Sequence, residues 1–269
     1  MSHCHKIPSK DKQAAIRLSG IIIFITLCFW QTTSTQAAQA QNRIPPDSRK
    51  TYIEGQSPRW LGAIGQLVIP GIRYQNGYSQ HHTEYCSATL INPKPAMASD
   101  IIITAWHCLE FYTDLSQTIT FHLSTNKPAQ VFEARRLQDG GGMDADWAIL
   151  RLSRAVSISE APALTPDSTT AETGVELVMA GYSRDAGLGQ GGQRLTYDNN
   201  CQVTAMTAGN SDSNCLAYKG ASGGAVVRYS NSGDALFTGV ISEGNSSGLS
   251  RFVPLPVFKR QLQYYFQDF

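Results

Sequence analysis

The sequence has no large excess of charge of either sign. Among its 269 residues, Lys and Arg number 22, Asp and Glu number 21, and only 16% of all residues are charged. A long basic face, and with it a nucleic-acid partner, is therefore not expected. Hydrophobic residues make up 42% of the chain. This composition suits a globular core and excludes collagen-like, coiled-coil and polar disordered chains.

The N-terminal hydrophobic run is too short to cross a bilayer. Leu18–Trp30 has 13 residues, whereas a spanning helix needs about 20. Basic residues precede this run, and small residues at Ala38 and Ala40 follow it, which is the order of a secretory signal. We predict a signal peptide over residues 1–40 and a secreted or periplasmic protein with no stable membrane anchor after cleavage. An uncleaved short anchor is the alternative.

Zinc-ligand spacing is missing as well. The sequence contains no C-x-x-C or H-x-x-x-H pattern, so we predict no metal. Of the six cysteines, Cys4 and Cys28 would leave with the signal peptide. An even number remains outside the cytosol, which favours two disulfides. Three pairings are possible, and the one between sequence neighbours, 86–108 and 201–215, closes the shortest loops. The four cysteines are Cys86, Cys108, Cys201 and Cys215.

Short apolar and β-branched runs recur along the chain, and no long helical pattern alternates with them. Their spacing favours barrels or sandwiches and not a parallel α/β sheet. A Pro- and Thr-rich stretch at 161–170 divides the runs into two halves. The tail predicts an amphipathic helix, because Phe258, Leu262 and Phe266 recur every four residues. The runs occupy residues 61–69, 86–91, 101–105, 117–123, 129–137, 146–152, 175–181, 193–206, 224–229, 235–242 and 250–255.

Three segments contain the residue types of a nucleophilic hydrolase. They read TAWHC (104–108), DADWAIL (144–150) and KGASGGAVV (219–227). A Ser hydroxyl needs an imidazole to take its proton and a carboxylate to orient that imidazole. The segments supply one residue of each type, and their conjunction indicates catalysis more strongly than any of them alone.

Two rival motifs fail on their context. Gly220–Gly224 fits the G-x-S-x-G elbow of α/β hydrolases, but that fold needs a His after the Ser, and the last His here is His122. Residues 187–192 fit G-x-G-x-x-G, but a strand-like segment follows, so no helix can receive a pyrophosphate. His81 and His82 are expected in a solvated loop.

From about Pro58 to its end, the chain resembles the chymotrypsin-like (trypsin-fold) serine proteases. CSATLINP is similar to the family's C-S-G-T-L-I, TAWHC to T-A-A-H-C, DWAILRL to D-I-A-L-L-x-L and GASGGAVV to G-D-S-G-G-P. VISEGN (240–245) resembles V-S-W-G, and the order His, Asp, Ser agrees. The resemblance implies an all-β fold of two six-stranded antiparallel β-barrels with a C-terminal helix.

The resemblance also implies roles for single residues. His107 would be the general base, Asp146 would orient it, and Ser222 would be the nucleophile. The backbone N–H groups of Gly220 and Ser222 would form the oxyanion hole. Asp144 is a rival for Asp146, but the apolar run follows Asp146 directly, as in the family.

Further positions follow from the same comparison. A Cys86–Cys108 bridge would tie the histidine loop to a barrel strand. Three residues are expected to offer backbone groups to an extended peptide, namely Ser242, Glu243 and Gly244. Leu216 is expected near the base of the substrate pocket, which would disfavour Lys or Arg there, and Tyr218 and Lys219 are candidates for its entrance. We predict neither a catalytic metal nor an organic cofactor.

The chain departs from trypsin at two positions beside the nucleophile. Ala221 stands where trypsin has the Asp that pairs with a new N-terminal amine, and Ala225 replaces a Pro. We therefore predict no activation by N-terminal insertion. Ala221 is more similar to the bacterial glutamyl-endopeptidase-like branch. That branch often has a His near the pocket, but Thr238–Gly244 contains none, so Glu selectivity does not carry over.

The predicted organisation follows from these segments. Residues 41–57 form an N-terminal extension, and 58–269 form the protease domain. Within it, one barrel covers about 58–160, a second about 171–255, and a helix about 255–267. The predicted function is that of an exported, monomeric serine endopeptidase that cleaves peptides or proteins through an acyl-enzyme. The alternative is a catalytically silent binding protein of the same fold.

Overall fold

The computed structural model describes residues 46–94, 97–124, 128–245 and 248–266. The predicted signal peptide lies outside the described residues, as does the beginning of the predicted extension. Within the described part of the chain, no helix is both long and apolar enough to cross a membrane.

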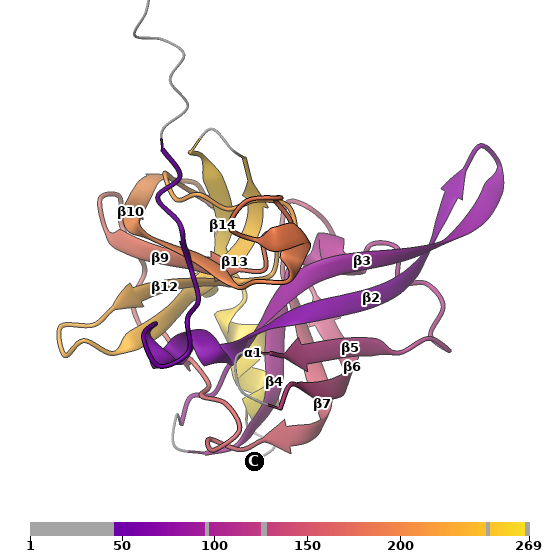
Figure 1. Cartoon of the computed structure of the whole chain (residues 1–269), viewed down its shortest axis with the longest axis horizontal. Coiled ribbons are helices and arrows are strands. Elements are labelled where there is room, and N and C mark those ends of the chain that lie inside the picture. Colours follow the sequence, from indigo (N-terminus) through magenta and orange to yellow (C-terminus); the bar gives the residue numbers. More distant parts are fainter. Residues whose placement is uncertain (1–45, 95–96, 125–127, 246–247, 267–269) are drawn as a thin grey trace, which may run out of the picture. The chain divides into compact units, whose positions relative to one another are not determined.

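Six antiparallel strands close into a first barrel, in the order β2-β3-β4-β7-β6-β5, and β2 pairs with β5 to complete the ring (Figure 1). Alternate side chains point inward, as strand geometry requires, so that Leu67, Ile69 and Phe121 are buried. The strands are β2 (Ile64–Gln75), β3 (Tyr78–Leu90), β4 (Ser99–Thr104), β5 (Ile119–Leu123), β6 (Gln130–Asp139) and β7 (Ala148–Val156).

The second barrel follows the order β10-β11-β14-β13-β12-β9 and is closed by pairing of β9 with β10. The two-residue strand β1 (Lys50–Thr51) adds to β10, and β8 (Thr165–Pro166) adds to β13. The predicted fold of two six-stranded antiparallel barrels is confirmed. The strands of the second barrel are β9 (Glu176–Gly181), β10 (Thr196–Met206), β11 (Ser211–Ser213), β12 (Ala225–Tyr229), β13 (Ala235–Gly244) and β14 (Ser250–Pro254).

The C-terminal helix α1 spans Lys259–Phe266, so Leu262 and Phe266 of the predicted face lie in it and Phe258 lies directly before it. Phe258 and Leu262 are buried, and the Phe258 ring stacks on Trp147 with centroids 5.4 Å apart. The helix begins after a 3-10 turn at Leu255–Val257. Pro256 lies in that turn, where its missing N–H is tolerated. Three other 3-10 helices are Arg59–Ala63, Trp106–Leu109 and Gln190–Gly192.

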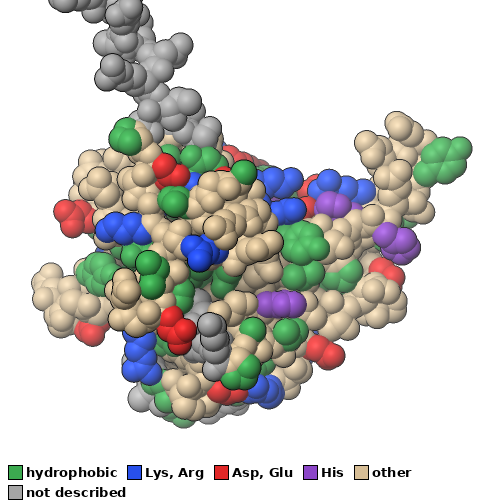
Figure 2. All heavy atoms as spheres, in the orientation of Figure 1, with side chains coloured by type: hydrophobic (Ala, Val, Ile, Leu, Met, Phe, Trp, Pro, Cys, Tyr) green, Lys and Arg blue, Asp and Glu red, His purple; other side chains and the backbone are tan. Residues whose placement is uncertain are grey.

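The β2–β3 hairpin extends well beyond the rest of its barrel (Figure 1). An Asn76-Gly77 turn with positive φ at both residues joins the strands, as a two-residue hairpin requires. The arm exposes Tyr74 and Tyr78 near its tip, where Figure 2 shows hydrophobic surface. His81 and His82, expected in a loop, lie in β3. Because the arm is polar and buries little, it lacks the alternating pattern that marks a strand in sequence.

Candidate active site

The histidine lies where strand β4 ends. Ala105 is extended, and the chain then enters the 3-10 helix Trp106–Leu109. A disulfide joins Cys108 in this helix to Cys86 in β3, so the histidine segment is bound covalently to a barrel strand. His107 is thereby held at the edge of the first barrel with 26% of its side chain exposed.

Asp146 lies two residues before β7, the strand that pairs with β4. Its carboxylate is fully buried, and both of its oxygens accept hydrogen bonds from His107. Oδ1 accepts from the backbone N–H at 2.8 Å, and Oδ2 lies 2.8 Å from the ring Nδ1. Oδ2 also accepts a hydrogen bond from the Ser242 hydroxyl. Asp144, the rival carboxylate, is exposed.

The electrostatics of this pair favour the ionised forms. Burial by itself would raise the pKa of Asp146, but hydrogen bonds from His107 and Ser242 hold that pKa below its usual value. Burial likewise lowers the pKa of His107, but the hydrogen bond and charge of Asp146 outweigh it and raise that pKa overall. The charges of Glu84 and Glu243 act in the same direction.

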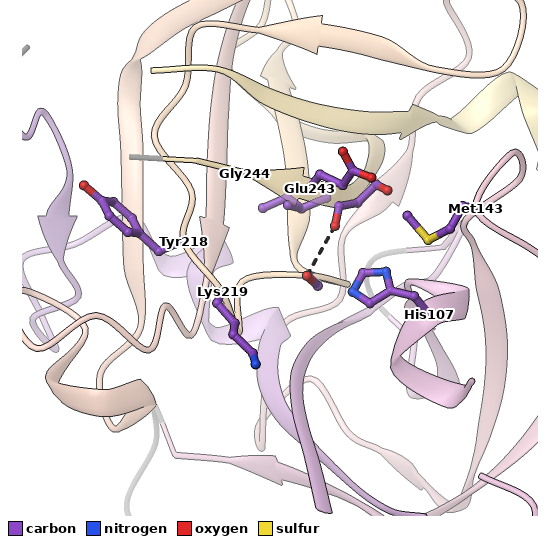
Figure 3. A pocket seen from close by; sticks show the side chains of 9 residues that line it. His107, Met143, Tyr218, Lys219, Glu243 and Gly244 are labelled. Atoms are coloured by element: carbon purple, nitrogen blue, oxygen red, sulfur yellow. Dashed lines mark hydrogen bonds between the residues drawn. The ribbon is translucent and has the colours of Figure 1, made fainter. Parts of the chain in front are cut away.

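Ser222 lies in a tight turn before β12, on the other side of the cleft. Its hydroxyl donates to the Ser242 carbonyl at 3.3 Å, the bond dashed in Figure 3. Among the described residues no hydrogen bond joins it to His107, whose Nε2 lies 3.9 Å from the Cys108 sulfur.

Gly223 has φ +82°, and a Cβ there would stand 2.1 Å from both the Ser87 carbonyl oxygen and Thr104 Oγ1. Only glycine fits directly after Ser222.

The turn also presents backbone donors. Gly220 has φ +95°, and a Cβ there would approach the Tyr182 carbonyl oxygen to 2.6 Å. Within the described part of the chain, neither the Gly220 N–H nor the Ser222 N–H donates a hydrogen bond. An oxyanion hole requires such uncommitted donors; Ser222 lines the cleft, whereas Gly220 is buried and is not among the lining residues.

Ser87, on β3 of the first barrel, holds this turn through two hydrogen bonds and makes a third to the segment after β9. Its N–H donates to the Ser222 carbonyl at 2.8 Å, and its hydroxyl donates to the Gly220 carbonyl at 2.9 Å. The same hydroxyl accepts from the Tyr182 N–H. No role for Ser87 is predicted from the sequence. In the sequence, only its position next to Cys86 in CSATLI could have indicated this role, because the hydrogen-bond partners of Ser87 in the turn lie far away along the chain.

The residues of the two barrels meet in one open cleft of about 320 Å³. In Figure 3, His107 and Met143 lie on one side of it, Tyr218 and Lys219 on the other, and Glu243 above. The exposed loop residue Met143 had no signal in the sequence. The cleft is lined by His107, Met143, Tyr218, Lys219, Ser222, Ile241, Ser242, Glu243 and Gly244.

Two segments meet beside Ser222. A Cβ on Gly244 would stand 2.3 Å from the Ala217 carbonyl oxygen, so the end of β13 lies against the chain at residue 217. Leu216, expected near the pocket base, is buried and is not among the residues that line the cleft. Its N–H donates to Asp198.

The disulfides pair as neighbours in sequence, Cys86 with Cys108 and Cys201 with Cys215. Cys86, His107 and Cys108 bring potential metal ligands within 4.8 Å of one another. The two sulfurs are joined, however, so neither is a thiolate that could bind a metal.

Two closed barrels with an Asp-His pair facing a serine turn define the class of chymotrypsin-fold proteins. Residues 69–264 match the trypsin family. The chain belongs to the trypsin family. No curated protein was found to match the chain.

Solved structures of bacterial proteases share the fold at low identity. The Rv3671c protease from M. tuberculosis, in its active form, is 17% identical with a TM-score of 0.55, and the match covers 76% of this chain and 81% of that one. The serine endoprotease from Yersinia pestis is 15% identical with a TM-score of 0.51, and the match covers 78% and 65%.

Proposed function

We propose that this protein is an exported serine endopeptidase, with His107, Asp146 and Ser222 as its catalytic residues. The observation that carries the proposal is that both oxygens of the buried Asp146 carboxylate bind His107, in the same cleft as Ser222. This arrangement leaves one ring nitrogen to take a proton, and it stabilises the imidazolium that results. Membership of the trypsin family supports the same chemistry.

Acylation begins when the Ser222 hydroxyl turns from the Ser242 carbonyl towards Nε2 of His107. Catalytic hydrogen bonds often shorten only when substrate is bound. The Ser222 oxygen attacks the substrate carbonyl carbon as His107 takes its proton. The N–H groups of Gly220 and Ser222 stabilise the oxyanion; removal of such a donor typically costs about 3 kcal/mol. His107 then protonates the departing amine, which leaves an ester on Ser222.

Deacylation repeats these steps with water as the nucleophile. His107 takes a proton from the water as the water attacks the ester, and it returns the proton to the Ser222 oxygen as the acid product leaves. His107 therefore carries the proton in each transfer, and the reaction needs only the peptide and water.

The substrate is a peptide or protein bound in extended form. Backbone groups of Ser242, Glu243 and Gly244, at the end of β13, pair with it as an added strand. Ala221 supports placement nearer the bacterial glutamyl-endopeptidase-like members than trypsin. The absence of His from Thr238–Gly244 argues against a preference for Glu.

Location and processing belong to the same proposal. Residues 1–40 are removed as a signal peptide, 41–57 form an extension, and 58–269 form the protease domain. The mature protein is a secreted or periplasmic monomer without a membrane anchor. Two disulfides are consistent with an oxidising compartment.

The test is labelling of the processed protein with a fluorophosphonate probe, followed by peptide-library cleavage. We expect covalent labelling of wild type, none of Ser222→Ala, and cleavage that tracks labelling. Both proteins should show the same thermal unfolding. A folded wild type that takes no label contradicts the proposal.

One observation favours a second candidate, a silent binding protein. The Ser222 hydroxyl is bonded to Ser242 and not to His107. If that bond persists when a peptide binds, the cleft holds peptides without cutting them. A wild type that binds peptides but does not react with the fluorophosphonate probe would identify the protein as a silent binding protein.

A further inference from the structure

The segment just before the predicted domain boundary is built into the second barrel. Lys50 and Thr51 form strand β1 opposite Tyr197 and Thr196 of β10, and the Tyr52 N–H donates to the Leu195 carbonyl (Figure 1). The segment therefore contributes both main-chain and side-chain contacts to the folded unit.

Arg49 is the most enclosed charged side chain of this segment, with 2% of it exposed. Its Nε and Nη2 donate to Asp47, and its Nη1 donates to Asp185 at 2.8 Å. The guanidinium carbon lies 3.9 Å from the centre of the Tyr218 ring. Burial alone lowers the pKa of Arg49, but the two carboxylates more than offset this and raise it. The cation is thus fully paired in a place where an unpaired charge is costly.

The partners of Arg49 outside its own segment belong to the two loops that flank the nucleophile turn. Asp185 lies in the loop after β9, and Tyr218 lines the cleft. The Tyr218 carbonyl accepts the Ala221 N–H at 2.9 Å, next to Ser222. The Arg184 N–H donates to the Lys219 carbonyl, which ties one loop to the other. A shift of Tyr218 or of the Asp185 loop is therefore transmitted to the backbone on both sides of Gly220.

We propose that Arg49 is a positioning residue that holds these two loops, and through them the Gly220 and Ser222 N–H groups, in the geometry needed for catalysis. The inference rests on the proposed function. It assigns to the N-terminal segment a part of the mature active site. Cleavage after Arg49 should therefore abolish activity, which is the opposite of zymogen activation.

The experiment compares processed wild type with Arg49→Leu and Arg49→Lys. We expect kcat/KM and the fluorophosphonate labelling rate of Arg49→Leu to fall at least about tenfold, since small misplacements of catalytic groups have effects of this size. The loss should be mainly in kcat, because an oxyanion hole acts in the transition state. Arg49→Lys keeps the positive charge but lacks the planar guanidinium, so its kcat should lie between those of wild type and Arg49→Leu.

Arg228→Leu is the matched control. It breaks a partly buried ion pair with Asp167, at the far end of β12 from the nucleophile turn. It should lower the unfolding temperature and leave the labelling rate of the folded protein unchanged. Two alanine variants test chemical rescue. Millimolar guanidinium should restore the labelling rate of Arg49→Ala, and it should leave the labelling rate of Arg228→Ala unchanged. Should Arg49→Leu fail to fold, Asp185→Asn tests the same link and should lower kcat in the same direction.

The outcomes separate the two proposals. A wild type that labels and cleaves, with Arg49→Leu and Asp185→Asn equally fast, overturns the role of Arg49 and leaves the proposed function intact. A wild type that never labels overturns both. Equal kinetic losses in the Arg49 and Arg228 variants would show a general loss of stability. This result would also overturn the role of Arg49.

Discussion

The two sides of the cleft are held in different ways. His107 and Asp146 flank paired strands of one barrel, and a disulfide fixes the histidine segment to a third strand. The Ser222 turn contains three glycines, and contacts from Ser87 in the other barrel and from the Arg49 segment support it. Local scaffolding can therefore position the base, whereas a glycine-rich turn depends on contacts from distant parts of the chain.

Asp146→Asn tests the histidine side and should have the largest effect. We expect kcat to fall about 10⁴-fold, because the amide cannot hold the required imidazole tautomer. Initial rates on a cleaved peptide measure this. Asp144→Asn, two residues away and exposed, should retain wild-type rates. If the losses were reversed, Asp144 would be the orienting carboxylate.

Gly220→Ala tests the serine side. A Cβ there would approach the Tyr182 carbonyl oxygen to 2.6 Å, on a residue with φ +95°. The turn must shift its N–H donors, and we expect kcat/KM to fall about 10²-fold. Gly233→Ala is the control, because Gly233 has φ +86° but open space around it. Equal losses in both variants would trace the effect to backbone strain and not to the displaced donors.

Ser87→Ala removes the support that the first barrel gives to this turn. The Tyr182 N–H and the Gly220 carbonyl lose a partner, so we expect the free energy of unfolding to fall by about 1–3 kcal/mol. We also expect kcat to fall about tenfold. Thr89→Val is the matched control on the same face of β3, since the Thr89 hydroxyl is buried without a partner among the described residues. Denaturant unfolding and kinetics are measured for both, and a stable, fully active Ser87→Ala would contradict the comparison.

Glu84→Gln should have the smallest effect, on the pH profile. His107 must be neutral to act as a base, so kcat/KM falls as the pH drops through its pKa. Glu84 helps to raise that pKa. Its neutralisation should lower the pKa and move the acidic limb to lower pH. The exposed Glu176 on β9 provides the control, Glu176→Gln. A limb that stays in place or moves to higher pH would show that the charge of Glu84 does not reach His107.

Several strands could be predicted from the sequence because their runs of apolar residues are buried, in β4 and β12 at consecutive positions and in β5 at alternate ones. The runs at 101–105, 117–123 and 224–229 became β4, β5 and β12. The hairpin arm, β1 and β11 were missed, because a polar arm and strands of two or three residues have no hydrophobic period. The terminal helix was visible through Phe258 and Leu262, which are both buried.

The residues of the candidate site likewise divide into those that could be predicted from the sequence and those that could not. Short motifs of neighbouring residues marked His107, Asp146, Ser222 and Gly220, and the disulfides followed the pairing of sequence neighbours. Ser87 and Arg49 carry no such motif. The partners that connect them to the active-site loops lie more than 90 residues away along the chain, as in the contacts Ser87–Tyr182 and Arg49–Asp185.

The residues by themselves therefore determined the class of fold and the chemical groups of the site, because strand periodicity and reactive side chains are properties of short segments. Only the tertiary structure decided how those groups are held, which carboxylate reaches His107, and that residues 49–52 belong to the folded unit. Hydrogen bonds and ion pairs act over a few ångströms in space, and chain closure brings together partners whose separation in sequence leaves no local pattern.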